Sequence, residues 1–467
     1  MKSFVLAFVS AVAAVCGAKV VTWLQPDSVL ATDGAYSVKV NGRPVDVIGI
    51  PKPSHCLKGD NAHPYYAAFF DADEEVTIEV RGAMPLRWAW ILPKRMDVKR
   101  MVKDDHTIVF KAKPPFNLVV EPQKRHRALV LSANVPETDA PKAGDPNVVY
   151  FGPGCHRFDK PLSVTANQTL YLAPGAVVEG AVRVQGDNVR VCGRGIVSGT
   201  PWAWCKGPAG WMFHVSGRNV SVRDVAIMGG WTWTLVLDRC EDALVDNVKI
   251  LNGRVLNDDG IDVCHSRRVT IRNSFVRSQD DCVAVKFWCE DLLVENCAFW
   301  TDVANIIRVG YECDGPAFPF RRHVYRGIDV LHQAIENDKA PDDYWTENTI
   351  AIQPSNDVVF EDMLFDDFRF DMPQVQDLFL CLRTPICRYG KTPHTQGGHA
   401  RNITFRNIHF PAKRPLGAFG IWLHSVDPDH RVEDISFENI DNLPVPVGVR
   451  GDVRNIRGLA IPGGCGK

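Results

Sequence analysis

Hydrophobic and polar positions alternate in short runs over the first third of this chain, as in Tyr36–Val47 and Glu75–Arg81. Glycine, proline and aspartate separate these runs. A segment with one apolar and one polar face is typical of antiparallel strands that pack as a sandwich. We therefore expect residues 19–145 to form a small β-sandwich domain, with the Pro-, Asp- and Lys-rich stretch 134–146 as the linker that follows it.

Residues 146–467 show a different pattern, in which short apolar strands are separated by glycine-containing bends and one motif recurs. Each copy has an Asp or Asn between apolar strand residues, and the clearest copies are at Asp224, Asn247, Asn273 and Asn296, in steps of 23, 26 and 23 residues. The Leu-x-x-Leu-x-Leu frame of leucine-rich repeats is absent. A repeat of this length made of strands and turns predicts an all-β domain, a parallel β-helix whose coils bury one continuous core. The aligned Asn and Asp residues suit side-chain ladders at its bends.

Composition and charge are those of a soluble globular protein. The chain has 467 residues, 45% of them hydrophobic and 23% charged, with a formal net charge of −2. This balance gives no broad basic surface, so we expect no nucleic-acid partner and no attraction to an anionic membrane. We expect a monomer.

The first 18 residues have the layout of a secretory signal peptide: Lys2, an apolar run from Phe4 to Cys16, and a small residue before Lys19. They predict a secreted or periplasmic protein. No apolar run approaches the ~20 residues that a membrane-spanning helix needs, so we expect no membrane insertion.

The chain has 14 cysteines, and the one at Cys16 belongs to the predicted signal peptide. The remaining number is odd, so at least one is unpaired or bridges two chains. Cys264, Cys282 and Cys297 lie within apolar strand patterns and are expected to be buried small hydrophobes. No Cys/His spacing resembles a zinc site, and we expect no metal and no cofactor.

Acidic side chains gather in two segments of the repeat region, Asn257–Asp262 and Gln279–Lys286. Asp259 and Asp280 are 21 positions apart, about one coil, and neighbouring coils of a β-helix are separated by ~4.8 Å. Asp259 should therefore lie beside Asp280 and Asp281. Three carboxylates this close cannot all ionise without cost, so at least one pKa rises, which allows an acid and a base to coexist. Glycoside hydrolysis requires such a pair.

Two other interpretations of these acidic residues stay open. The same oxygens could bind calcium, although an EF-hand frame with Gly260 at its sixth position puts Val255 first and Ser266 last, and neither residue suits that role. The carboxylates could also be solvated turn residues.

The motifs Asn257-Asp-Asp-Gly-Ile-Asp262 and Gln279-Asp-Asp-Cys-Val-Ala-Val-Lys286 resemble the two leading motifs of glycoside hydrolase family 28, the polygalacturonase family. Gly230–Leu235 and Tyr171–Ala176 are similar to segments of its bacterial members. The resemblance implies an inverting hydrolase on a right-handed, pectin-lyase-like parallel β-helix. It also implies that Asp280 is the general acid, while Asp259 and Asp281 are the bases that orient the attacking water.

The chain departs from the family pattern at three places. Asp258 stands where threonine is usual, Thr301–Asn305 replaces a Gly-His-Gly motif, and the Arg-Ile-Lys motif that grips a substrate carboxylate is not evident. Recognition of a uronate requires an Arg or Lys side chain. The candidate substrate-binding residues are Lys286, Arg308, Arg321, Arg322 and Arg383, the aromatic residues Trp288, Tyr311 and Trp231, and His265.

The sequence thus predicts a metal-independent glycoside hydrolase that acts on polysaccharide or oligosaccharide, with the insertion Tyr311–Asn348 beside its binding groove. Two rivals remain. A β-helical polysaccharide lyase would use a Lys or Arg base, and a noncatalytic carbohydrate-binding or surface protein could use the same scaffold.

Overall fold

A computed structural model describes residues 18–51, 64–122, 127–253, 255–333, 348–371, 379–384, 397–410, 420–442 and 447–459. The predicted signal peptide lies outside these ranges except for Ala18, and the insertion Tyr311–Asn348 lies partly outside them. Within them the regular structure is all strand apart from the short 3-10 helix η2 (Lys94–Met96). No helix among the described residues is long and apolar enough to span a membrane.

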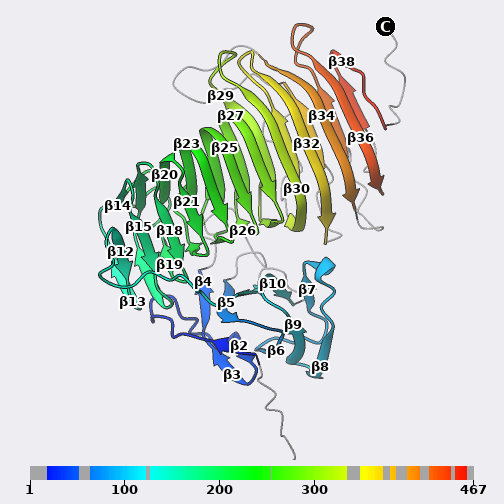
Figure 1. Ribbon diagram of the computed structural model, residues 1–467. Coiled ribbons are helices and arrows are strands. Elements are labelled where there is room, and N and C mark those ends of the chain that lie inside the picture. Colours follow the sequence, from blue (N-terminus) through cyan, green and yellow to red (C-terminus); the bar gives the residue numbers. More distant parts are fainter. Residues whose placement is uncertain are drawn as a thin grey trace, which may run out of the picture.

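The N-terminal strands form two facing sheets (Figure 1). One sheet contains β1 (Val20–Val21), β4 (Val47–Ile50), β5 (Tyr65–Ala72), β7 (Trp90–Leu92), β10 (Phe116–Glu121) and β11 (Leu129–Asn134). The other contains β2 (Tyr36–Val40), β3 (Arg43–Val45), β6 (Val76–Gly82), β8 (Arg100–Asp104) and β9 (Thr107–Ala112). Alternate side chains such as Val38, Ile78, Phe70 and Leu131 fill one core between the sheets. The alternating pattern therefore does form a β-sandwich, in which β5 and β11 pair in parallel and the other strand pairs are antiparallel.

The remaining strands form one continuous sheet in which every coil pairs in parallel with the next, so the predicted right-handed parallel β-helix is confirmed. Its N-terminal coils consist of β12 (Val148–Phe151), β13 (Gly154–Arg157), β14 (Leu162–Thr165), β15 (Thr169–Leu172), β16 (Ala176–Glu179), β17 (Val182–Gln185), β18 (Arg190–Gly193), β19 (Ile196–Ser198), β20 (Phe213–Arg218), β21 (Ser221–Arg223) and β22 (Ala226–Met228). Here a strand pairs with the third strand after it.

From β23 onward each coil contains a long strand in place of two shorter ones, and a strand pairs mainly with the second strand after it. These coils consist of β23 (Leu235–Asp246), β24 (Lys249–Leu251), β25 (Ile261–Arg272), β26 (Phe275–Ser278), β27 (Val283–Glu295), β28 (Ala298–Thr301), β29 (Ile307–Cys313), β30 (Phe320–Gln333), β31 (Ile350–Gln353), β32 (Val359–Phe370), β33 (Leu380–Arg383), β34 (His399–His409), β35 (Ile421–His424), β36 (Val432–Asp441), β37 (Val447–Arg450) and β38 (Val453–Arg454).

The recurring Asp and Asn residues lie at the bends between strands. Asp224, Asn247, Asn273 and Asn296 have φ angles of 69°, 56°, 53° and 53°, a left-handed conformation that Asn and Asp tolerate better than other residues with a Cβ. The Asn247 side-chain amide donates to Asp224 Oδ1 at 2.7 Å. The repeat thus supplies both the turn conformation and some of the bonding between coils.

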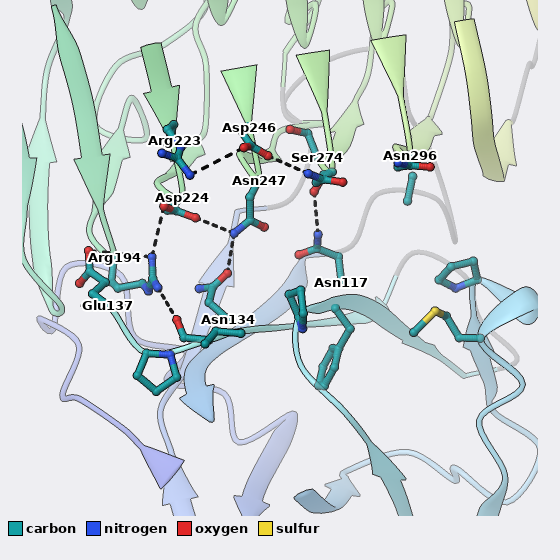
Figure 2. A pocket seen from close by; sticks show the side chains of 18 of the residues that line it. Asn117, Asn134, Glu137, Arg194, Arg223, Asp224, Asp246, Asn247, Ser274 and Asn296 are labelled. Atoms are coloured by element: carbon teal, nitrogen blue, oxygen red, sulfur yellow. Dashed lines mark hydrogen bonds and ion pairs between the residues drawn. The ribbon is translucent and has the colours of Figure 1, made fainter. Parts of the chain in front are cut away.

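The sandwich packs against the side of the helix (Figure 1). Every residue of β5 is buried, because one face of this strand fills the sandwich core while Tyr65, Ala67 and Phe69 belong to a core shared with strands of the helix. A polar cavity borders this contact, and Figure 2 shows Arg194 and Asn247 reaching toward the sandwich side. Arg194 Nε is 3.0 Å from Asp71 Oδ1, and Asn247 Nδ2 donates to Asn134 Oδ1 at 2.8 Å.

Stacked aromatic rings fill the interior of the C-terminal coils. The ring centres of Tyr325 and Phe365 are 4.7 Å apart, those of Phe365 and Phe405 4.9 Å, and those of Phe405 and Phe437 5.1 Å. Phe365 is fully buried between two of these rings. One apolar residue in the same place on each coil thus builds a continuous stack.

The substitution Phe365→Ala should lower the free energy of unfolding by about 3–5 kcal/mol, because it leaves a cavity between two rings that cannot close up. Urea unfolding measures this loss. Phe318→Ala, at a side chain that is 44% exposed, is the matched control and should change stability far less. Equal losses in the two variants would contradict the stacking account.

Candidate active site

The two acidic motifs lie immediately before neighbouring strands. Ile261 of β25 pairs with Val283 of β27, so Asp259 and Asp281, each two residues before its strand, occupy the same place on successive coils. The backbone confirms this alignment, since Gly260 N donates to Asp281 O at 2.8 Å. The nearest carboxylate oxygens of Asp259, Asp280 and Asp281 all lie within 4.8 Å of one another. The structure therefore brings together the three acids singled out in the sequence.

Trp233 occupies the matching place on the preceding coil, because Leu235 pairs with Ile261. Asn305 occupies it on the following coil, because Val283 pairs with Ile307. Neither residue was singled out from the sequence. Both could have been found by counting one coil back from Asp259 and one coil forward from Asp281. Asn305 ends the Thr301–Asn305 segment that replaces the family's histidine motif.

Asp259 is buried and paired with a buried lysine. Lys286 Nζ lies 2.8 Å from Asp259 Oδ2 and 2.9 Å from Asp262 Oδ1, and 3.4 Å from the centre of the Trp233 ring. Burial raises the pKa of Asp259 and Lys286 opposes that rise, while burial raises the pKa of Asp262 well above its usual value. Burial lowers the pKa of Lys286, but the two carboxylates outweigh it and hold that pKa well above the usual value. Lys286 is therefore a fixed cation between two carboxyl groups.

Asp281 is buried and paired with an arginine. Arg308 Nε lies 2.9 Å from Asp281 Oδ2, and Asn305 donates to Oδ1 from its backbone N at 3.0 Å and from Nδ2 at 2.6 Å. Arg308 also donates to Gln353 Oε1 at 3.3 Å, and its guanidinium lies 5.9 Å from the Tyr311 ring centre. These bonds fix the orientation of the Asp281 carboxylate.

Asp280 differs from its two neighbours because its side chain is partly exposed and, among the described residues, it forms no ion pair with a Lys or Arg. Its backbone is held firmly: Asp258 Oδ1 accepts from Asp280 N at 3.3 Å, and the Ser278 and Thr301 hydroxyls donate to Asp280 O at 2.6 and 2.8 Å. Burial raises the pKa of Asp280 well above its usual value, and the charges of Asp259 and Asp281 add to the rise. Of the three carboxyls, Asp280 is the one suited to carry a proton.

Asp258, which stands where the family has threonine, is fully buried and serves the backbone. Its Oδ1 accepts from Gln279 N at 2.6 Å, and its Oδ2 accepts from Gly253 N at 2.9 Å. The extra carboxylate thus fixes the turn that carries Asp280.

Two of the predicted substrate-binding residues, Trp288 and His265, lie beside a shallow surface depression that Phe318 also lines. Trp288 stacks on Phe318 with ring centres 6.2 Å apart. His265 stacks on Phe287 at 4.4 Å and makes contacts of 2.7 Å with Asp238 and 3.2 Å with Asp314. His265 therefore bridges the carboxylates of Asp238 and Asp314 beside this depression.

The other candidates lie elsewhere. Tyr311 is buried, and Trp231 is fully buried, with its Nε1 bonded to Ala209 O at 2.9 Å. Arg321 and Arg322 are paired with Glu290, and Arg383 is mostly buried. A pair of aromatic rings that the sequence did not point to lies beside Asp259, where Trp211 and Trp233 stack nearly parallel with ring centres 5.9 Å apart.

The three carboxylates could in principle hold a divalent cation, and their nearest oxygens are close enough to share one. Lys286 and Arg308 already supply two positive charges to Asp259 and Asp281. These charges oppose the entry of a calcium ion, so the arrangement suits proton transfer better than metal binding.

Comparison with known proteins agrees with the resemblance drawn from the motifs. The model of glycosyl hydrolases family 28 matches residues 198–302, which contain all three carboxylates. The chain is 37% identical over 78 residues to a protein of Aspergillus oryzae described as probable rhamnogalacturonase A; this covers 17% of the chain and 16% of that relative. These two matches support the resemblance to glycoside hydrolase family 28 over the segment that carries the three carboxylates.

One solved structure extends the likeness in fold over most of the chain. Dex49A from Penicillium minioluteum is 13% identical, with a TM-score of 0.63 over 93% of this chain and 99% of that chain. The family 28 exopolygalacturonase of Yersinia enterocolitica is 11% identical, with a TM-score of 0.48 over 94% of this chain and 96% of its own.

The substitution Lys286→Met should destabilise the chain by about 3–5 kcal/mol at pH 8, because it leaves Asp259 and Asp262 buried without a cation. The loss should be smaller at pH 5. Without the lysine the folded-state pKa values of these carboxyls rise further, so the folded chain binds more protons than the unfolded chain and stability falls as pH rises. Urea unfolding at the two pH values measures the difference.

Lys103→Met is the control, because Lys103 is 58% exposed and bonds to Glu79 on the sandwich surface. It should cost less than about 1 kcal/mol at either pH. A loss for Lys286→Met that does not depend on pH would show that the lysine acts through packing alone.

Proposed function

We propose that this chain hydrolyses glycosidic bonds of a polysaccharide or oligosaccharide, with Asp280 as the general acid and Asp259 and Asp281 as the bases. One observation carries the proposal: a partly exposed carboxyl with a raised pKa lies within 4.8 Å of two carboxylates that are each paired with a cation. This asymmetry separates an acid from its bases, which glycoside hydrolysis requires.

In the proposed reaction the Asp280 carboxyl donates its proton to the glycosidic oxygen as the bond to the anomeric carbon breaks. A water held by Asp259 and Asp281 attacks that carbon and gives up a proton to one of them. Lys286 and Arg308 hold the two bases in position, and Asp258 keeps the Asp280 turn in place. General acid catalysis of this kind contributes about 10²–10⁴-fold.

We propose that the reaction inverts the anomeric configuration. The carboxyls here are closer together than the ~6.5–9.5 Å of most inverting enzymes, so the support is different. Both base carboxylates are committed to a cation, Asp259 to Lys286 and Asp281 to Arg308, which makes each a weaker nucleophile toward carbon while still able to accept a proton from water. Proton NMR of the first product formed identifies its anomer, and retention of configuration would overturn the inverting mechanism.

The sugar at the cleavage point is, in this proposal, a neutral one. Lys286 and Arg308 are the basic groups paired with the acids among the described residues, and neither is free to bind a uronate carboxylate. Glu312 adds negative charge, since it contributes to the raised pKa of Lys286. A negatively charged sugar would be repelled here.

A substrate panel tests this preference. Purified protein should release reducing sugar from neutral glucan oligosaccharides faster than from polygalacturonate of matched length. Faster cleavage of polygalacturonate would reverse the assignment.

The rival lyase reaction needs a basic residue that can take a proton from carbon. Lys286 is buried and its pKa is held well above the usual value, so it keeps its proton at neutral pH and is a poor base. Products with an unsaturated end that absorbs in the ultraviolet would favour a lyase.

The proposal also covers the organisation of the whole chain. We propose that residues 146–467 form the catalytic domain and that residues 19–145 support it. The signal-like composition of residues 1–18 supports a secreted or periplasmic location.

The substitution Asp280→Asn should lower kcat by about 10²–10⁴-fold, because the amide cannot donate the proton that the leaving oxygen needs. Thermal unfolding and substrate affinity should change little. Asp434→Asn, at a partly exposed residue of β36 bonded to Asn455, is the matched control and should keep full activity. Unchanged turnover in Asp280→Asn would sink the acid assignment, and a wild type inactive on every glycan would favour the noncatalytic binding protein.

The pH dependence of kcat/KM should be bell-shaped. Activity falls on the acidic side as the bases take up protons and on the alkaline side as Asp280 loses its own. Because burial and two neighbouring charges raise the pKa of Asp280, the alkaline limb should lie well above the usual range of an aspartate. Any residual activity of Asp280→Asn should lack that limb, and an unchanged profile would assign the limb to another group.

A further inference from the structure

A second group of potential ligands lies at one corner of the β-helix, on three successive coils. Asp357 precedes β32, His399 begins β34 and His430 precedes β36. The register aligns these coils, since Phe360 pairs with Ala400 and Ala400 pairs with Val432. One ligand atom from each of the three residues lies within 4.8 Å of the other two. None of these residues belongs to the acid cluster.

His430 is held in one orientation by a carboxylate. Its Nδ1 lies 2.7 and 2.8 Å from the two oxygens of Asp427. Asp427 is itself fixed, because its Oδ1 accepts from Asp429 N at 2.9 Å and from His430 N at 3.1 Å. The His430 side chain is only 10% exposed. A carboxylate on one ring nitrogen that leaves the other aimed at a ligand group is the usual support of a metal-binding histidine.

The other two residues face the second nitrogen of that ring. His430 Nε2 lies 3.0 Å from Asp357 Oδ1, and the His399 ring centre lies 5.3 Å from that of His430. Asp357 has a φ of 62° and donates its backbone N–H to Gly397 O at 2.6 Å. Gly397 also leaves room for the ring, since a Cβ there would lie 3.1 Å from His430 Cγ.

We propose that Asp357, His399 and His430 bind a divalent transition-metal ion, with Zn²⁺ the best match. Two imidazoles and one carboxylate are ligands that zinc prefers, and a water completes the tetrahedron. Ligand atoms about 2.0–2.1 Å from zinc are separated by about 3.3 Å, close to the 3.0 Å between His430 Nε2 and Asp357 Oδ1. The metal replaces the proton that lies between these two atoms, and that proton is released to solvent.

Such a metal joins three coils that are otherwise connected through their strand pairing. It also acts close to the acid cluster. Ser355, two residues before Asp357, donates to Tyr311 O at 2.6 Å, and Gln353 accepts from Arg308 at 3.3 Å. Arg308 in turn holds Asp281. The proposed role is therefore a staple that fixes the coil on which the Arg308 contact depends.

Zinc titration of the chelator-treated full-length protein tests the site, with isothermal titration calorimetry for stoichiometry and thermal unfolding for the effect on stability. The wild type should bind one Zn²⁺ with high affinity and unfold at a higher temperature when it is bound. His399→Ala and Asp357→Asn should each abolish the high-affinity site. Asp427→Asn should weaken it by about 10–100-fold, because the histidine loses its support.

His409→Ala is the control, since His409 lies on the same strand as His399 and is paired with Asp441 at 2.8 Å outside the cluster. It should bind zinc as the wild type does. Asp281→Asn separates the two sites: zinc that is lost in Asp281→Asn and kept in His399→Ala would belong to the acid cluster and would overturn the proposal. The absence of saturable binding to the wild type would overturn it as well. Because Asp357 is 39% exposed at its side chain, Asp357→Asn keeps the test valid if His399→Ala fails to fold.

Discussion

The parallel register between coils is the constraint from which the active site follows. Each coil of the β-helix aligns on the next at a strand spacing of ~4.8 Å. A residue just before one strand therefore lies beside the residue just before the paired strand of the next coil. Applied to Asp259 and Asp281, this rule sets like charges side by side in a buried place. The fold brings together what catalysis needs and creates an electrostatic cost in doing so. Two basic residues offset that cost, since Lys286 lies between Asp259 and Asp262, and Arg308 binds Asp281.

Asp280 lies one residue outside the aligned column and, within the described ranges, has no such ion pair. Burial and the neighbouring negative charges raise its pKa well above the usual value. The difference between acid and base comes from the position of the cations relative to the column.

The spacing of the repeat was enough to predict the β-helix and the meeting of Asp259 with Asp280 and Asp281, because a constant coil length converts sequence distance into spatial contact. It was not enough to show that Lys286 forms ion pairs with Asp259 and Asp262, because those contacts depend on the direction of its side chain. The cluster of Asp357, His399 and His430 was missed for a related reason. These residues are 42 and 31 positions apart, because the C-terminal coils are unequal in length, and their proximity depends on a register that the sequence alone does not fix.

The sandwich is tied to the acids by a short path of hydrogen bonds. The Tyr65 hydroxyl of β5 donates to Asn252 O at 2.7 Å, and the Asn252 side chain donates to Asp258 O at 3.4 Å. Asp258 accepts from the backbone N–H of Asp280. Because Tyr65 is buried with its hydroxyl satisfied by the helix, withdrawal of the sandwich would expose Asn252 and free a backbone acceptor beside this turn. The backbone of Asp280 is therefore positioned in part by contacts that begin in the N-terminal sheets, which gives those strands a physical connection to the carboxylate cluster.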